Sequence, residues 1–256
     1  MALLRSNLWD GRKHYLDRMT IRELVRAYFA YPAIQAYLAL GVASSVATIW
    51  LAPSLLGAAA AIAATMFVYG LIWYALHRFV LHGRFLFRSP ATAAMWKRIH
   101  FDHHSDPNDL GVLFGALYTT LPTIAIATIP LGWAIGGPGG GAAAFAAGLF
   151  ITCMYEFCHC IQHLRFTPKH PWLKRVKRLH MAHHFYNEQG NYGITTFLWD
   201  RLFGSYYARN GDMPPSETVR NLGYTPAQYE RYPWVAELSG LNDDAPVERG
   251  RAASEG

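Results

Sequence analysis

Cationic residues are missing from two long stretches of this 256-residue chain. No Lys or Arg occurs from Ala27 through His77 or from Ile99 through Leu164, although the chain contains 23 of these residues. Only 16% of the residues are charged and 52% are hydrophobic, which is apolar for a soluble domain. Because strict segregation of Lys and Arg is a membrane effect, this pattern argues against buried helices of a large soluble core.

Four segments within these stretches are apolar enough, at about 20 residues each, to be membrane-spanning helices. The connections around Pro53–Gly57 and Gly136–Gly141 carry no charge, so we expect two helical hairpins. By the positive-inside rule the N-terminal arm, the segment Arg78–Arg98 and the chain after Leu164 are cytoplasmic. The net charge of +6 then reflects topology and anionic lipid headgroups, with no nucleic-acid partner. The predicted spans are Ala33–Leu56, Gly57–Leu76, Val112–Ile135 and Gly141–Cys158.

Cysteine is scarce, and the three residues present lie close together in the sequence. Cys153, Cys158 and Cys160 fall at the cytoplasmic end of the fourth predicted span. Disulfides are rarely kept in that compartment. Cys158 and Cys160 each flank His159 by one residue and so point away from whatever His159 faces. We therefore interpret the cysteines as packing residues rather than metal ligands.

The parts of the chain outside the predicted spans form an arm and a tail. In the arm, residues 1–32, Thr20 and Glu23 make a capping box that opens an amphipathic helical pattern. That helix either lies in the membrane interface or packs on the rest of the protein. Residues 33–210 form the membrane-embedded domain, and residues 211–256 form a polar tail. The end of the tail, Asp243–Gly256, is expected to be disordered.

Ten of the twelve histidines occur in four short clusters. The third cluster begins 82 residues after the first, so the chain contains two similar halves, which implies two similar metal half-sites. Only His14 and His170 lie outside the clusters, and we interpret both as ordinary polar residues. The clusters read His77-Arg-Phe-Val-Leu-His82, His100-Phe-Asp-His103-His104, His159-Cys-Ile-Gln-His163 and His180-Met-Ala-His183-His184.

Helical geometry explains most of these spacings, because residues three or four apart project from one helix face. Each of the last three clusters can therefore converge from one helix. His77 and His82 differ, since residues five apart are offset by about 140° on an α-helix. Either the helix is distorted there, or the two rings address different metals.

The clusters also share a side of the membrane, because all four lie at or beyond the cytoplasmic ends of predicted spans. A charged site can form there without lying at the bilayer centre. Ten imidazoles divide as five per ion for two ions, which leaves one open position on each six-coordinate ion where dioxygen can bind. Imidazole suits zinc, copper, iron and nickel alike, so ligand type does not choose the metal.

The clusters resemble the histidine boxes of the fatty acid hydroxylase superfamily, and most closely those of the fatty acid and ceramide 2-hydroxylases. Sterol desaturases of the same superfamily tend to have three residues in the first box, whereas this chain has four. Carotenoid hydroxylases share the four-residue box but differ around the third box and beyond His184. The similarity covers His77 to Tyr207, with His82-Gly83, Pro107, Asp109, Tyr155-Glu156, His183-His184-Phe185-Tyr186-Asn187, Gly193-Ile194-Thr195-Thr196 and Trp199-Asp200-Arg201-Leu202-Phe203-Gly204.

The resemblance implies an enzyme with two iron ions, which zinc can replace in purified protein, and dioxygen as co-substrate. It implies hydroxylation of a fatty acid or ceramide acyl chain, at C2 in the relatives it resembles most. Some family members carry a fused cytochrome b5 domain, and we expect a separate donor here, of cytochrome b5, ferredoxin or reductase type. The expected location is a bacterial inner membrane or the endoplasmic reticulum, with both termini cytoplasmic.

Carboxylates near the boxes are candidates for orienting an imidazole. Glu156 stands one turn before His159 on the same face, and a charge is costly near the membrane, so it is the main candidate. A metal transporter or sensor is the alternative from another class, but it would place polar groups near the midplane. Weaker carboxylate candidates are Asp102, Asp106, Asp109, Glu188 and Asp200.

Overall fold

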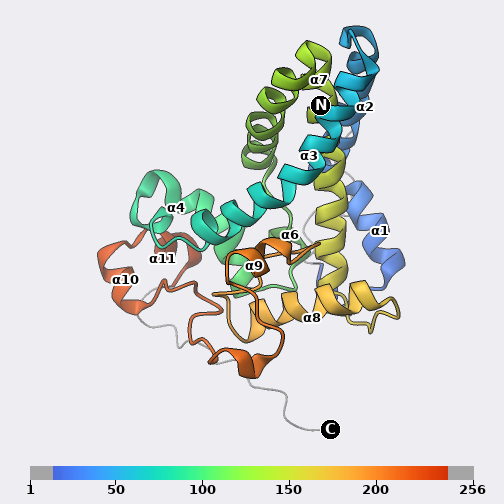
Figure 1. Cartoon of the computed structure of the whole chain (residues 1–256). Helices are drawn as coiled ribbons and strands as arrows, with labels where there is room; N and C mark the ends of the chain where they lie inside the picture. Colours follow the sequence, from blue (N-terminus) through green and yellow to red (C-terminus); the bar gives the residue numbers. More distant parts are fainter. Residues whose placement is uncertain (1–13, 242–256) are drawn as a thin grey trace.

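The protein, described over residues 14–241 by a computed structural model, is built almost entirely of helices. Long helices stand together at one end of the molecule and short helices gather at the other (Figure 1). Within residues 14–241 there is no β-strand, and an isolated bridge joins Tyr15 to Asp109. The predicted all-α class is confirmed. The short elements are η2 (Leu16–Arg18), α1 (Ile21–Ala30), η4 (Leu86–Arg88), α4 (Pro90–Trp96), α5 (Asp102–Ser105), α6 (Leu110–Leu113), α8 (Pro171–Phe185), α9 (Leu198–Leu202), η6 (Asn210–Asp212), α10 (Pro226–Arg231) and α11 (Trp234–Ser239), with π-helical turns η3 (Leu76–Leu81) and η5 (Lys97–Phe101).

The long helices are α2 (Pro32–Leu51), α3 (Leu55–Ala75) and α7 (Leu117–His163). A short connection joins α2 to α3, and the Ser54 hydroxyl caps α3 by accepting from the Leu56 and Gly57 amides. However, α2 and α3 each pack chiefly against α7 rather than against one another. The two helices of the first predicted hairpin are therefore held together mainly through their contacts with α7.

Helix α7 combines the third and fourth predicted spans in one 47-residue element that reverses direction. Gly136 and Gly137 leave the helical conformation, and Gly137 has a φ of 62°, which glycine adopts readily. A Cβ added at Gly132 would lie 2.2 Å from the Gly140 oxygen, so the two parts of α7 are in close contact. Figure 1 shows them side by side. The connection predicted at Gly136–Gly141 is thus a tight reversal.

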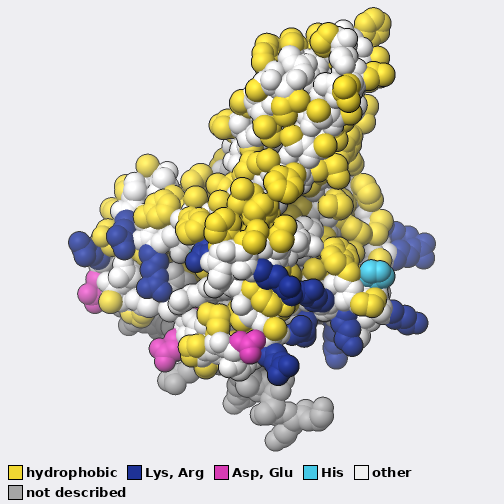
Figure 2. All heavy atoms as spheres, in the orientation of Figure 1, with side chains coloured by type: hydrophobic (Ala, Val, Ile, Leu, Met, Phe, Trp, Pro, Cys, Tyr) yellow, Lys and Arg dark blue, Asp and Glu magenta, His cyan; other side chains and the backbone are white. Residues whose placement is uncertain are grey.

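Within the described residues, three helices are long and apolar enough to cross a membrane: Pro32–Leu51, Leu55–Leu81 and Leu110–His163. Large apolar side chains on them face outward, with Trp50 and Leu55 84% and 81% exposed. Such exposure suits lipid contact and is unfavourable in water. The described Lys and Arg residues all lie outside α2, α3 and α7, and the face in Figure 2 shows dark blue side chains only on the part of the molecule away from the helix tips.

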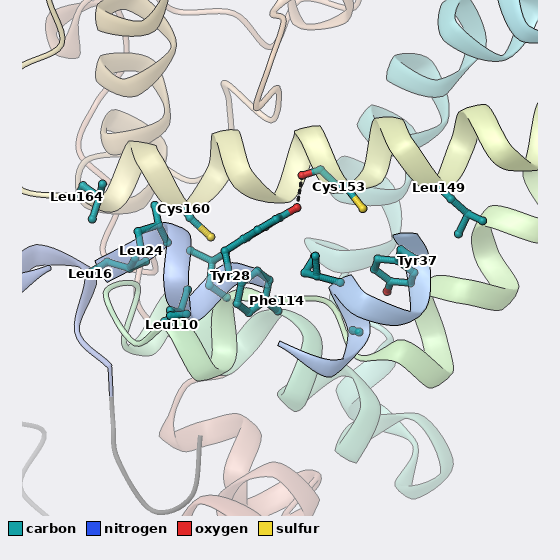
Figure 3. Packing of buried hydrophobic residues seen from close by; sticks show 14 of the residues in the cluster. Leu16, Leu24, Tyr28, Tyr37, Leu110, Phe114, Leu149, Cys153, Cys160 and Leu164 are labelled. Atoms are coloured by element: carbon teal, nitrogen blue, oxygen red, sulfur yellow. Dashed lines mark hydrogen bonds between the residues drawn. The ribbon is translucent and has the colours of Figure 1, made fainter. Parts of the chain in front are cut away.

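Helix α1 packs on α7 with its apolar side and exposes the other side. The predicted capping box is present, because Thr20 Oγ1 accepts from the Glu23 amide and Glu23 Oε2 accepts from the Thr20 amide. Leu24 and Tyr28 are buried, and the Tyr28 hydroxyl donates to the Cys153 carbonyl at 2.5 Å (Figure 3). Ile21 and Phe29 remain about half exposed. Packing on α7 therefore accounts for the buried face.

The three cysteines are free and buried. Cys153 and Cys160 belong to the hydrophobic core between α1 and α7, as Figure 3 shows. Cys158 Sγ accepts a hydrogen bond from Gln162 Nε2 at 3.3 Å. Their packing role agrees with the interpretation from the sequence.

The segment that follows residue 210 was expected to be a polar tail, yet its described part has a core. Tyr224 and Val235 are fully buried, and they pack in one cluster with Phe87 and Trp96 from η4 and α4. Aromatic residues spaced through the segment form this core. The average polarity of the segment gave no sign of them. The arm before residue 14 and the expected disorder of Asp243–Gly256 lie outside the described residues.

Candidate metal centre

The first histidine pair converges through a change of helix type at the end of α3. Residues Leu76–Leu81 form a π-helical turn, in which the His82 amide donates to the His77 carbonyl at 3.0 Å. A π-helix closes its turn over five residues instead of four and is often found at functional sites. The two Nε2 atoms therefore lie 3.2 Å apart. Of the two alternatives left open by the spacing, helix distortion is the one observed.

The other three clusters come from different elements that meet below the long helices. His100 lies in the π-helical turn η5, and His103 and His104 lie in α5. The C-terminal turns of α7 carry His159 and His163, one turn apart. The last turns of α8 carry His180, His183 and His184. All except His82 are buried, so the structure brings the ten histidines of the four clusters together away from solvent.

Nine of the ten clustered imidazoles form two groups of similar make-up, because each group combines histidines from the two clusters of one half of the chain with one histidine from the other half. In each group every residue offers one nitrogen within 4.8 Å of the others. His100 is outside both groups, but its Nε2 lies 2.8 Å from His82 Nε2. The expected five-and-five division is thus five and four, with His100 adjoining the four. One group contains His103, His159, His163, His180 and His184, and the other contains His77, His82, His104 and His183.

Each His-His pair is split between the groups, so the second and the fourth cluster each contribute to both groups. His103 joins the third and fourth clusters while His104 joins the first. His183 and His184 are divided in the same way. The reason is that consecutive residues on a helix point about 100° apart. A helix that passes between two centres can therefore supply one imidazole to each.

Backbone carbonyls orient three rings of the four-histidine group. Nδ1 of His77 donates to the Tyr192 carbonyl at 2.6 Å, and Nδ1 of His183 donates to the Gly190 carbonyl at 2.7 Å. Nδ1 of His104 donates to the Val219 carbonyl at 2.9 Å. Since a carbonyl only accepts, the proton is on Nδ1 and the Nε2 lone pair is free. Metal-bound histidines are usually held in this way.

The chemistry of these nitrogens fits transition-metal ions. Burial lowers the pKa of His183 to about 4, and it lowers the pKa of the six other clustered histidines that lie outside the long apolar helices well below 6.5. These rings are thus neutral at pH 7, as metal ligation requires. Nε2 of His104 and Nε2 of His183 are buried without a hydrogen-bond partner, which is costly unless a metal binds them.

Distances between facing nitrogens agree with shared ions. His103 Nε2 lies 3.1 Å from His159 Nε2, and His163 Nε2 lies 3.0 Å from His180 Nε2. Two imidazole nitrogens bound at right angles on one ion, each about 2.1 Å away, would be about 3.0 Å apart. The residues present therefore fit a metal in each group.

A cavity of about 220 Å³ opens onto both groups. It lies where α3, α7 and the α4–α5 region meet. Its wall is largely apolar, with Trp73, Leu76, Met95 and Ile99 among its lining, and it includes four threonines. The histidines that reach it are His77, His100, His103, His159, His180 and His184.

Glu156 also lines this cavity and is buried. Its Oε1 accepts from the Gly115 amide at 3.3 Å. Within residues 14–241 the carboxylate makes no hydrogen bond to an imidazole, so the expected contact with His159 is not seen. Glu156 therefore lies in the cavity wall and holds the backbone at Gly115.

The other carboxylates divide into structural and site-supporting residues. Asp102 pairs with Lys97 at 2.8 Å, and Asp109 caps α6 through the Gly111 amide. Asp200 is fully buried and accepts from the Tyr192 and Gly193 amides and from Ser205 Oγ, at 2.8 to 2.9 Å. Glu188 accepts from Thr218 Oγ1 at 2.5 Å. Asp200 thus fixes the loop whose Tyr192 carbonyl holds His77.

Sequence patterns did not indicate the three orienting carbonyls. Every residue has a carbonyl, so those of Gly190, Tyr192 and Val219 carry no signal of their own. Resemblance to the family was the sole sequence signal for the supporting loop. That signal is the run Gly193-Ile194-Thr195-Thr196 through Trp199-Asp200, which begins directly after Tyr192.

Comparisons with known proteins agree with this arrangement. The fatty acid hydroxylase family profile matches residues 62–205, which contain all four histidine clusters. The ceramide very long chain fatty acid hydroxylase SCS7 of Saccharomyces cerevisiae is 34% identical over 148 residues, covering 55% of this chain and 36% of the yeast protein. The dihydroceramide fatty acyl 2-hydroxylase FAH2 of Arabidopsis thaliana is 33% identical over 145 residues, covering 53% and 55%. Human fatty acid 2-hydroxylase is 28% identical over 151 residues, covering 54% and 37%.

A solved structure described as full-length scs7p, with only the hydroxylase domain visible, is similar in fold. Its TM-score is 0.61 at 30% sequence identity, and the match covers 74% of this chain and 69% of that one. The chain spans about a third to just over half of the length of these curated relatives. Since the family profile covers more than half of the sequence and all four clusters, this chain belongs to the fatty acid hydroxylase family.

Proposed function

We propose that this protein hydroxylates the acyl chain of a membrane lipid, a fatty acid or a ceramide, at C2. The observation that carries the proposal is the mainly apolar cavity that reaches both buried imidazole groups. Apolar walls suit a hydrocarbon chain, and neutral imidazoles suit redox-active metal ions. The position C2 and the acyl class come from the names of the relatives.

The ten clustered histidines would hold two iron ions, which supply the redox chemistry that activates dioxygen toward an unactivated C–H bond. Zinc in these sites would be inert to that chemistry. The chain's own part is to keep the imidazoles neutral and oriented, to exclude water by burial, and to hold one methylene beside the ions. Glu156 lines the same cavity and is placed to contact a bound substrate.

Two other functions, metal transport or sensing and the oxidation of sterols or carotenoids, fit these observations less well. A transporter or sensor would put polar groups at the middle of the membrane, whereas α2 and α3 contain no ionisable side chain except tyrosine. Sterol or carotenoid oxidation by the same centre would use a wide, rigid substrate. A new double bond in the product would indicate a desaturase, and a hydroxylated sterol or carotenoid would favour those substrates over an acyl chain.

Hydroxylation is expected to depend on metal, dioxygen and a reductant together. Membranes containing the iron-loaded protein are supplied with labelled dioxygen, a reductant and either a fatty acid or a ceramide. Mass spectrometry should find one labelled oxygen in the acyl chain, at C2. Zinc-loaded protein is the control and should yield none. Labelled product at equal yield from the zinc form would overturn the proposal.

We further propose that four segments cross the membrane, since α7 reverses at Gly136–Gly137. Four crossings place both termini and all four histidine clusters on one side, which positive charge identifies as cytoplasmic. Three crossings would place the termini on opposite sides. The domain boundaries at residues 33 and 210 belong to the same proposal.

Cysteine labelling is expected to separate these topologies. Arg22→Cys replaces an exposed residue that precedes the long helices in the sequence, and Gly211→Cys replaces an exposed residue that follows them. Leu55→Cys replaces an 81% exposed residue at the start of α3. An impermeant maleimide should label Arg22→Cys and Gly211→Cys from the same face and Leu55→Cys from the other. The native cysteines are buried and serve as the unreactive background. Labelling of Arg22→Cys and Gly211→Cys from opposite faces would exclude four crossings.

A further inference from the structure

Three cavities meet at one side chain, the indole of Trp73. It lines the 220 Å³ cavity of the metal centre, a cavity of about 10 Å³ deeper between α3 and α7, and a cavity of about 20 Å³ beside the loop Gly193–Thr196. We propose that Trp73 is the floor of the acyl-chain cavity and determines the length of chain that the protein accepts. This inference rests on the proposed acyl-chain hydroxylation.

The deeper cavity continues the line of the main one. On α3 its lining runs from Trp73 back to Thr65, away from His77, and on α7 it runs from Thr123 on to Leu131. Both intervals are eight residues, about 12 Å of helix at 1.5 Å per residue. The main and the deeper cavities share only Trp73 and Thr123 in their lining. The indole is much the larger of the two side chains, so it forms the partition.

Aromatic neighbours hold the indole across the groove. Trp73 stacks on Tyr155 with ring centroids 6.0 Å apart and planes at 24°, and it packs against Tyr69 at 5.7 Å. The Tyr69 hydroxyl in turn shares a hydrogen bond with Thr152 Oγ1 at 3.0 Å. These contacts tie α3 to the second part of α7. A floor held on two sides defines a fixed depth rather than a gradual taper.

The direction of the chain follows from the surroundings. Histidines of α5 and α8 line the main cavity, whereas the deeper cavity beyond Trp73 is lined by no histidine and mostly by apolar side chains such as Val68 and Leu131. The tail of an acyl chain, which is apolar along its length, therefore points toward Trp73. Carbons beyond the floor have no space, since the deeper cavity is about 10 Å³.

Opening the floor is expected to favour longer chains. In Trp73→Leu the two cavities join, and each methylene that gains a buried place raises kcat/KM about fourfold. The test uses the full-length, iron-loaded protein in membranes and a mixture of saturated acyl lipids that differ by two carbons. Mass spectrometry of the hydroxylated products gives the relative kcat/KM for each length. The preferred length should increase by two or more carbons in Trp73→Leu.

Two variants complete the experiment. Trp50→Leu removes an 84% exposed tryptophan from α2 and should keep the wild-type profile. Adding Ala127→Phe to Trp73→Leu refills the deeper cavity, which Ala127 lines, and should return the preference to shorter chains. If Trp73→Leu does not fold, Trp73→Phe opens a smaller gap and should shift the profile in the same direction.

The outcomes separate this inference from the function on which it rests. Wild-type protein that hydroxylates no acyl lipid would overturn the function. Wild-type activity together with a Trp73→Leu or Trp73→Phe profile of unchanged shape, even at lower total rate, would overturn the role of Trp73 as the floor. A shift toward longer chains that Ala127→Phe reverses supports it.

Discussion

His159→Ala and His183→Ala are each expected to abolish hydroxylation and to lower the metal content of the folded protein. His159 belongs to the five-histidine group and His183 to the four-histidine group. Removing a ligand should cost more than the roughly 10- to 100-fold seen for partners outside the first coordination sphere. We therefore expect a loss of activity greater than about 100-fold in either variant.

Elemental analysis of purified protein measures the predicted loss of metal. Wild type should carry two transition-metal ions per chain, as iron, zinc or both, and each variant should carry fewer. Because the groups are separate, each variant should weaken mainly one ion. His170→Ala is the matched control, since His170 is exposed and its ring meets only the Trp172 ring, with centroids 6.5 Å apart, among the ring contacts of the described chain. Wild-type metal content and activity in both variants would refute the dimetal proposal.

Asp200→Asn is expected to weaken metal binding about 10- to 100-fold although Asp200 touches no imidazole. The Asp200 carboxylate accepts three hydrogen bonds in a fully buried place. Asparagine replaces one oxygen with a donor, which then faces an N–H or O–H, and a buried donor without an acceptor costs about 1–3 kcal/mol. The Tyr192 carbonyl that orients His77 would move as a result.

The measurement is the fraction of metal retained after dialysis against a chelator. Asp212→Asn is the control, because Asp212 also accepts two backbone amides but is exposed and far along the chain from the clusters. Thermal unfolding of both variants in the metal-free state shows whether the fold itself has changed. Equal metal retention in Asp200→Asn and wild type would show that the loop does not position His77.

The sequence alone determined the class of fold and the identity of the chemical groups. Apolar length and the absence of Lys and Arg are summed over some 20 residues, so α2, α3 and both parts of α7 could be located without tertiary information. Ten histidines in short clusters likewise indicated the residues of the candidate centre. These properties are local, and a local pattern survives whatever the chain does elsewhere.

Only the tertiary structure decided how those groups are combined. Whether His103 or His104 joins a given group depends on where the helix passes between the two groups. The five-residue spacing of His77 and His82 left two alternatives open, and the π-helical turn decides between them. The contact of Glu156 with Gly115 instead of His159 depends on how the start of α7 approaches its end. The carbonyls of Gly190, Tyr192 and Val219 become specific only through position. These choices arise from packing between segments far apart in sequence, which residue order does not encode at short range.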